Sequence, residues 1–184
     1  MLTTGVDAGA AFVGTEKGDI FVGSVSSTLA LDTLNKIDTI DGGAGIDTLK
    51  ISDETGTVVV PNMSNIEIIE VTGVAGVTVD TTATTGVTDL NIIKAAGAID
   101  ADAGSTTNVT VNMKAAGAAV VVDGGKDVNV TLTNVDGDTD GAVGPDTATD
   151  VVTIGATTNA AGNVVVDMTG KAATTDATLS AVTV

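Results

Sequence analysis

The residues best suited to chemistry in this 184-residue chain are the aspartates and glycines of residues 41–50. Their sequence, D-G-G-A-G-I-D-T-L-K, contains the repeat pattern G-G-x-G-x-D-x-(large apolar)-x. Gly43 and Gly45 permit positive φ angles, which let backbone carbonyls turn toward a metal ion. Asp41 and Asp47 supply hard carboxylate oxygens, the ligand type that calcium prefers. The segment predicts a calcium-binding turn, and an ordinary tight Asp-Gly turn is the alternative interpretation.

A degenerate copy of the pattern precedes this segment, at residues 14–22. Asp19 and Phe21 occupy the positions that Asp47 and Leu49 take in the complete copy. If the two copies stack on neighbouring strands about 4.8 Å apart, their carboxylates repel by roughly 1 kcal/mol in water and about 3–4 kcal/mol at an effective dielectric near 20. A calcium ion between them would reverse the sign of this energy, so Asp19 joins the predicted ligands.

A second candidate calcium loop has the sequence D-G-D-T-D-G at residues 136–141. Asp136, Asp138 and Asp140 have the spacing of the first half of an EF-hand loop. The second half is missing, because Thr147 stands where an EF-hand carries its bidentate glutamate. A solvated acidic loop is the alternative interpretation. Asp123 and Asp127 belong to a segment that resembles the start of the repeat, but Lys126 stands at a sensitive position and an ordinary turn is favoured. Asp100 and Asp102, which precede Gly104, are ambiguous between a turn and a metal loop.

Composition restricts the class of function. The formal net charge of −17 disfavours nucleic acid and anionic membranes as partners and favours cations. The absence of Cys excludes disulfides and thiolate zinc sites. Without His or Cys the chain lacks the usual general bases and thiol nucleophiles, and its two Phe residues cannot line an aromatic substrate cleft. We therefore expect no enzyme, and no apolar run reaches the roughly 18 residues needed to insert into a membrane.

The elements that would position these loops are short β-strands. Val, Ile, Leu and Met alternate with polar residues in several segments, most clearly at residues 108–113, 127–132 and 163–168. Gly, Asn, Asp and Thr separate these segments, as is typical of turns. Strands are predicted near residues 48–51, 57–60, 66–71, 77–80, 88–93, 108–113, 119–122, 127–132, 150–154, 163–168 and 177–184.

An internal repeat indicates how the strands are arranged. The sequence K-A-A-G-A occurs at residues 94–98 and again at residues 114–118. Such a period, roughly 20 residues with two or three short strands, fits one coil of a parallel β-solenoid or β-roll. A β-sandwich also has closely spaced short strands and remains the alternative. Residues 24–40 are consistent with either a short helix or a further coil.

Two segments follow from these patterns. Residues 1–50 form a calcium-binding segment, and residues 51–184 form an Ala-, Thr- and Val-rich β-solenoid continuous with it. The N-terminus lacks the basic and apolar regions of a cleavable signal peptide. The C-terminus ends in strand-like alternation, so we expect the chain to be a fragment of a longer protein.

The paired motifs at residues 14–22 and 41–50 resemble those of RTX-type bacterial surface proteins, which include surface-layer (S-layer) proteins and large adhesins. The resemblance implies calcium in the nonapeptide turns, export by type I secretion through a C-terminal signal, and calcium-dependent assembly on the extracellular cell surface. This chain has one complete repeat and one degenerate repeat.

The leading hypothesis is a structural cell-surface protein that self-assembles with calcium into an S-layer, fibre or extracellular matrix. The alternative is an adhesin, or a calcium-binding accessory module of a larger secreted protein. The expected partners are other copies of the chain and divalent cations, with surface polysaccharide as a further candidate.

Overall fold

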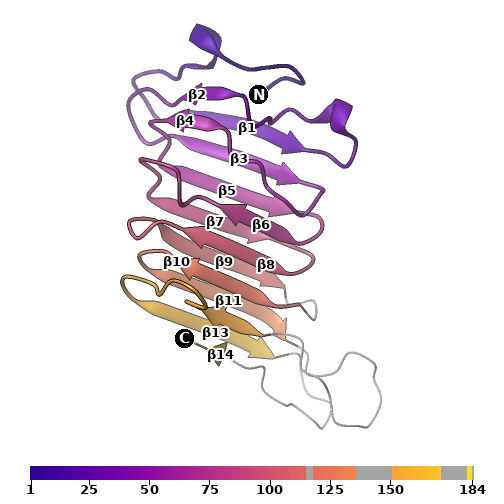
Figure 1. Cartoon of the computed structure of the whole chain (residues 1–184), viewed down its shortest axis with the longest axis vertical. Helices are drawn as coiled ribbons and strands as arrows, with labels where there is room; N and C mark the ends of the chain where they lie inside the picture. The colour runs from indigo at the N-terminus through magenta and orange to yellow at the C-terminus, as the bar shows by residue number, and fades with distance from the viewer. Residues whose placement is uncertain (115–117, 136–150, 171–181, 184) are drawn as a thin grey trace.

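Parallel β-sheets make up nearly all the regular structure of the computed structural model, which describes residues 1–114, 118–135, 151–170 and 182–183. Within these residues the larger sheet has seven strands, in the order β1 (Ile20–Val25), β3 (Thr48–Asp53), β5 (Ile68–Gly73), β7 (Asp89–Lys94), β9 (Asn108–Lys114), β11 (Val128–Val135) and β13 (Val164–Gly170). The smaller sheet has five described strands, β6 (Val77–Asp80), β8 (Ile99–Ala103), β10 (Val120–Gly124), β12 (Val152–Ile154) and β14 (Val182–Thr183). A two-stranded sheet of β2 (Thr39–Asp41) and β4 (Asn62–Ser64) lies near the N-terminal end (Figure 1).

The chain passes back and forth between the sheets, so that neighbours within a sheet are two elements apart in sequence. Figure 1 shows the strands stacked along the long axis of the molecule. In the larger sheet Thr48 pairs with Ile68, Ile68 with Asp89, and Asp89 with Asn108. These pairs have a nearly constant spacing in sequence, which matches the period expected from the internal repeat. We call each passage through both sheets a circuit.

The hydrophobic core is built from columns of side chains in register on successive strands. Alternate residues of a strand point to opposite faces, so one residue in two reaches the core. One column contains residues that are at most 1% exposed: Leu49, Ile69, Leu90, Val109 and Val128. Burying each such side chain contributes about 1.5–3 kcal/mol. The small Val, Leu and Ile side chains therefore supply the core without large aromatics.

The N-terminal segment covers the first circuit. The backbone N–H of Leu2 donates to the Val22 carbonyl at 2.8 Å, on the edge of β1. Leu2 and Leu34 are both buried, and a β-carbon on Gly23 would lie 2.9 Å from a side-chain atom of each. Gly23 thus leaves room for two leucines that close this end of the core.

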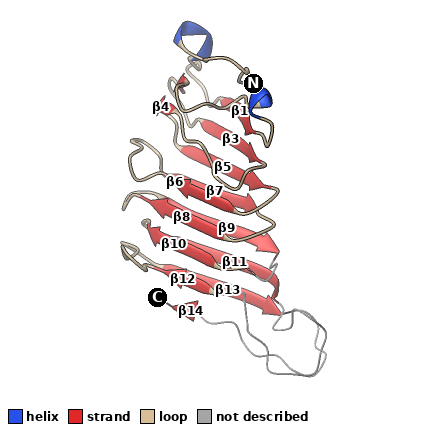
Figure 2. Cartoon of the chain, turned by 45° about the vertical axis from the view of Figure 1, so that its right-hand side comes forward, coloured by secondary structure: helices blue, strands red, loops and turns tan. Residues whose placement is uncertain are grey.

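Helical structure in the described residues is limited to two 3-10 turns, η1 (Gly9–Phe12) and η2 (Leu29–Leu31) (Figure 2). The segment 24–40, which the sequence left open between a helix and a further coil, contains η2 and most of β2. Within the described part of the chain, no helix combines the length and apolar character needed to cross a membrane.

The predicted all-β class is confirmed, and the described strand pairs are all parallel, unlike the antiparallel pairs of the sandwich alternative. The strand predicted at residues 57–60 is wrong: only Thr57 makes an isolated bridge, to Thr78, and the regular strand begins beyond Pro61. The strands β1, β2, β4 and β8 were not predicted. The proposed segment boundary at residue 50 falls inside β3.

Candidate metal site

The two glycine-rich motifs form turns that lie directly against each other. We call residues 14–19 the first turn and residues 42–47 the second turn. The Gly14 N–H donates to the Asp41 carbonyl at 2.7 Å, and the Ala44 N–H donates to the Thr15 carbonyl at 3.0 Å. In the strands that follow, Phe21 pairs with Leu49, as the motif alignment predicts, and Leu49 is fully buried.

The second turn depends on its glycines. Gly43 and Gly45 have φ angles of +89° and +120°, a region that favours glycine, as predicted. A β-carbon on Gly43 would lie 2.3 Å from the Thr15 carbonyl oxygen, and one on Gly42 would lie 1.7 Å from the Asn65 carbonyl oxygen. Glycine at these positions lets the second turn touch the circuits on both sides.

Asp47 is completely buried at the centre of this arrangement. Its Oδ1 accepts a 2.6 Å hydrogen bond from the Asp19 N–H, and its own N–H donates to Glu67 Oε2 at 2.8 Å. Its Oδ2 is buried and has no hydrogen-bond partner. An unpaired buried acceptor costs about 1–3 kcal/mol, and more when it is charged.

Two other fully buried carboxylates in the described residues have a backbone N–H on each oxygen. Asp53, also fully buried, accepts from the Thr55 N–H on Oδ1 and from the Gly56 N–H on Oδ2, both at 2.9 Å. Fully buried Asp38 likewise has a donor on each oxygen. Among the described residues Asp47 Oδ2 is the one buried carboxylate oxygen without a partner.

Asp19 and Asp41 lie beside Asp47 but already have donors. Asp19 Oδ2 accepts from the Thr15 N–H at 2.6 Å and from the Thr15 hydroxyl at 2.8 Å, and these bonds hold the pKa of Asp19 below its usual value. Asp41 Oδ1 accepts from the Asn65 amide at 2.8 Å and the Gly43 N–H at 3.1 Å, which together lower the pKa of Asp41.

A backbone carbonyl oxygen lies near Asp47 Oδ2. A β-carbon on Gly42 would lie 2.7 Å from Asp47 Oδ2 and 1.7 Å from the Asn65 carbonyl oxygen. Both oxygens therefore lie next to the Gly42 α-carbon. The described residues contain no group of three or more acidic, His or Cys side chains that could hold a metal. A calcium ion here would therefore take backbone carbonyls and water as its remaining ligands, which calcium accepts.

Five of the eight predicted ligands are thus brought to one corner of the molecule: Asp19, Asp41, Gly43, Gly45 and Asp47. The other three, Asp136, Asp138 and Asp140, lie outside the described residues. Sequence reasoning missed Asn65 and Glu67. Glu67 follows Asp47 at the spacing of the internal repeat, so that period is the signal that could have identified it.

A second acidic group lies on β6, β8 and β10, where Asp80, Asp102 and Asp123 are neighbours in register. Burial raises the pKa of Asp102, and the charges of Asp100, Asp80 and Asp123 raise it further. The Asp123 carboxylate accepts hydrogen bonds from backbone N–H groups, at 2.7 Å from Thr157. These aspartates lie in strands or at strand ends, and Asp100 and Asp102, which the sequence left ambiguous, are both within β8.

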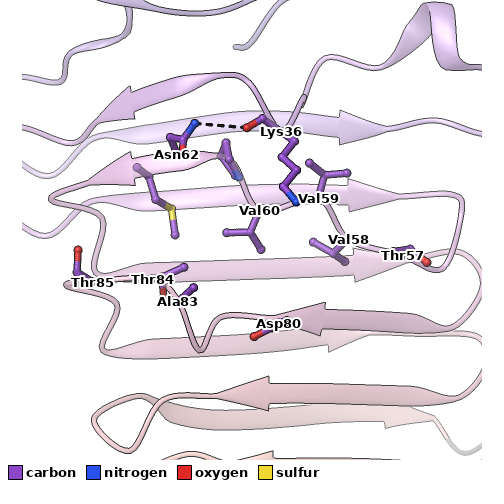
Figure 3. A pocket seen from close by; sticks show the side chains of 12 residues that line it. Lys36, Thr57, Val58, Val59, Val60, Asn62, Asp80, Ala83, Thr84 and Thr85 are labelled. Carbon is purple, nitrogen blue, oxygen red and sulfur yellow. Dashed lines mark hydrogen bonds between the residues drawn. The ribbon is translucent and has the colours of Figure 1, made fainter.

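A groove of about 580 Å³ lies between β4 and β6, where regular strand pairing is interrupted (Figure 3). Val58, Val60 and Met63 contribute apolar surface, and Lys36 and Asp80 contribute charge. Neither of the two buried, unpartnered side-chain atoms in the described part of the chain lies in this groove. It therefore offers less specific chemistry than the corner at Asp47.

Comparisons with family models, curated proteins and solved structures find no match to this chain.

Proposed function

We propose that this chain is a calcium-binding structural segment of an RTX-type bacterial cell-surface protein, folded as a parallel β-solenoid. The observation that carries the proposal is the buried, unpartnered Oδ2 of Asp47, placed between glycine-rich turns. The solenoid is supported by the alternation of the chain between two parallel sheets, and by the nearly constant length of the circuits from β3 to β11.

Calcium would stiffen the corner of the molecule that the stacked turns form. An ion on Asp47 Oδ2 would supply the positive partner that this oxygen lacks, and it would connect the second turn to the backbone of the next circuit at Asn65. Because the ion binds the folded chain and not the unfolded one, it stabilises the fold by about 2.7 kcal/mol when its concentration is 100 times its Kd.

Charge supports a role in calcium-dependent assembly outside the cell. With a net charge of −17, copies of the chain repel one another in the absence of divalent ions. Within the described residues a single ion pair, Lys50 with Glu70 at 2.8 Å, compensates acidic side chains. Divalent cations would reduce this repulsion and allow copies to join into an S-layer, fibre or matrix.

The experiment is to measure particle size by light scattering and thermal unfolding by circular dichroism, in EDTA and at increasing calcium. Magnesium at equal ionic strength is the control, because it screens charge equally but requires stricter octahedral coordination. The proposal expects calcium to raise the unfolding temperature and the particle size, with a weaker effect of magnesium.

The unfolding temperature and the particle size together distinguish the assembling structural protein from the alternative function. A calcium-stabilised chain that remains a monomer would favour the adhesin or accessory-module alternative. A chain whose stability and size are the same in EDTA and calcium would contradict both.

A further inference from the structure

The two stacked turns place their aspartates in the same way, but the hydrogen-bond donors to the two aspartates differ. In each turn the carboxylate Oδ2 points back toward the first glycine: a β-carbon on Gly14 would lie 3.0 Å from Asp19 Oδ2, and one on Gly42 would lie 2.7 Å from Asp47 Oδ2. Thr15 donates to Asp19 Oδ2 through both its N–H and its hydroxyl. Gly43, the residue equivalent to Thr15, donates its N–H to Asp41 instead.

In the second turn no side chain can donate to Asp47 Oδ2 in the way that Thr15 donates to Asp19 Oδ2. A side chain at Gly43 is excluded by the Thr15 carbonyl oxygen, 2.3 Å from the β-carbon position, and by the positive φ of +89°. The first turn has more room, because a cavity of about 190 Å³ lies beside Thr15 and Asp19. A threonine is therefore tolerated in the first turn and not in the turn stacked beneath it.

We propose that Thr15 takes the place of a cation in the first turn, so that this corner binds a single calcium ion, on Asp47, and Asp19 is not a ligand. The inference rests on the proposed calcium function and adds its stoichiometry at this corner. A cation on Asp19 Oδ2 would have to displace two short hydrogen bonds, whereas Asp47 Oδ2 has none to lose. Asp19 is also partly exposed, so water competes with any ion there.

A Thr15→Gly substitution should therefore create a site. It removes the hydroxyl and the side chain, and it restores the G-G that opens the complete motif. The backbone N–H of residue 15 remains, but as a glycine it can turn to another acceptor, as the Gly43 N–H does. Asp19 Oδ2 would then resemble Asp47 Oδ2, and the variant should bind one more calcium ion than the unmodified chain.

The test is the number of calcium ions that the full chain binds, measured by isothermal titration calorimetry. Each variant is compared with the unmodified chain, so that ions bound outside this corner contribute equally to both numbers. Asp47→Asn should lose one ion. Asp19→Asn should lose none and change the calcium Kd less than about threefold. Thr15→Gly should gain one ion, and the double variant Thr15→Gly/Asp19→Asn should lose that gain.

The outcomes separate this inference from the proposed function. If Asp19→Asn loses an ion, or if folded Thr15→Gly gains none, the role of Thr15 is refuted while calcium binding at Asp47 stands. If Asp47→Asn loses no ion, the proposed function itself is contradicted at this corner. Should Thr15→Gly fail to fold, by circular dichroism, the Asp19→Asn measurement still decides the question.

Discussion

Replacing Asp47 with asparagine should change the free energy of unfolding in opposite directions with and without calcium. In EDTA the wild-type chain carries a buried carboxylate oxygen that has no donor. An asparagine can keep the hydrogen bond from the Asp19 N–H and removes the negative charge. Because an unpaired buried acceptor costs about 1–3 kcal/mol, the variant should be about 1–2 kcal/mol more stable than wild type in EDTA.

Calcium should reverse this order. At 100 times its Kd the ion stabilises the wild-type chain by about 2.7 kcal/mol, and the Asp47→Asn variant gains nothing from it at this site. The variant should then be about 1 kcal/mol less stable than wild type. Urea unfolding at constant ionic strength, extrapolated linearly to water, measures both differences.

Asp53→Asn is the matched control. Asp53 is as deeply buried as Asp47, but backbone N–H groups already occupy both of its oxygens. In the Asp53→Asn variant the side-chain amide N–H would face one of these backbone N–H donors. The variant should therefore lose about 1–3 kcal/mol of unfolding free energy, equally in EDTA and in calcium. If Asp47→Asn behaves like this control, Asp47 is an ordinary turn residue and the cation argument is refuted.

Three further predictions concern the stack and its charges. Gly42→Ala should cost about 2–3 kcal/mol in urea unfolding, because its β-carbon would lie 1.7 Å from the Asn65 carbonyl oxygen; an unchanged midpoint would contradict that close approach. Leu90→Ala should cost about 2–5 kcal/mol and leave the stabilisation by calcium unaltered, whereas a lost calcium response would mean that the core and the corner are coupled. Asp102→Asn should stabilise the chain at pH 7 by roughly 0.5–1 kcal/mol after solvent screening. The pKa of Asp102 is raised above 3.8 in the folded chain, so the stability of the wild-type chain increases as pH falls through that raised value. The stability advantage of Asp102→Asn should therefore disappear in acid. If thermal unfolding shows an advantage that is independent of pH, relief of charge repulsion is excluded as its cause.

The sequence predicted strands best where large apolar residues alternate with polar ones. The segments that became β9 and β11 alternate Val, Leu and Met with polar residues, and those apolar side chains are buried. The strand β8 was missed because its sequence, I-D-A-D-A, has low strand propensity. Ala101 and Ala103 are buried there only because β6 and β10 flank them in register, which is a tertiary effect.

The candidate site was predicted in part for a similar reason. The motif itself identified Asp47 and the positive φ angles of its glycines, because these properties are local to the turn. The contributions of Asn65 and Glu67 depend on which circuits meet at the corner. That register follows from the lengths of the loops that separate Asp19, Asp47 and Glu67 along the chain, and the local pattern does not encode it.

Whether Asp47 holds a calcium ion can be determined from a crystal structure of the chain grown in calcium, with an anomalous difference map. We predict a calcium peak about 2.3–2.6 Å from Asp47 Oδ2, with backbone carbonyl oxygens among its ligands, and no peak at Asp19 Oδ2. A map without a peak at Asp47, in which Oδ2 instead accepts a hydrogen bond from the Gly43 N–H, would contradict this prediction.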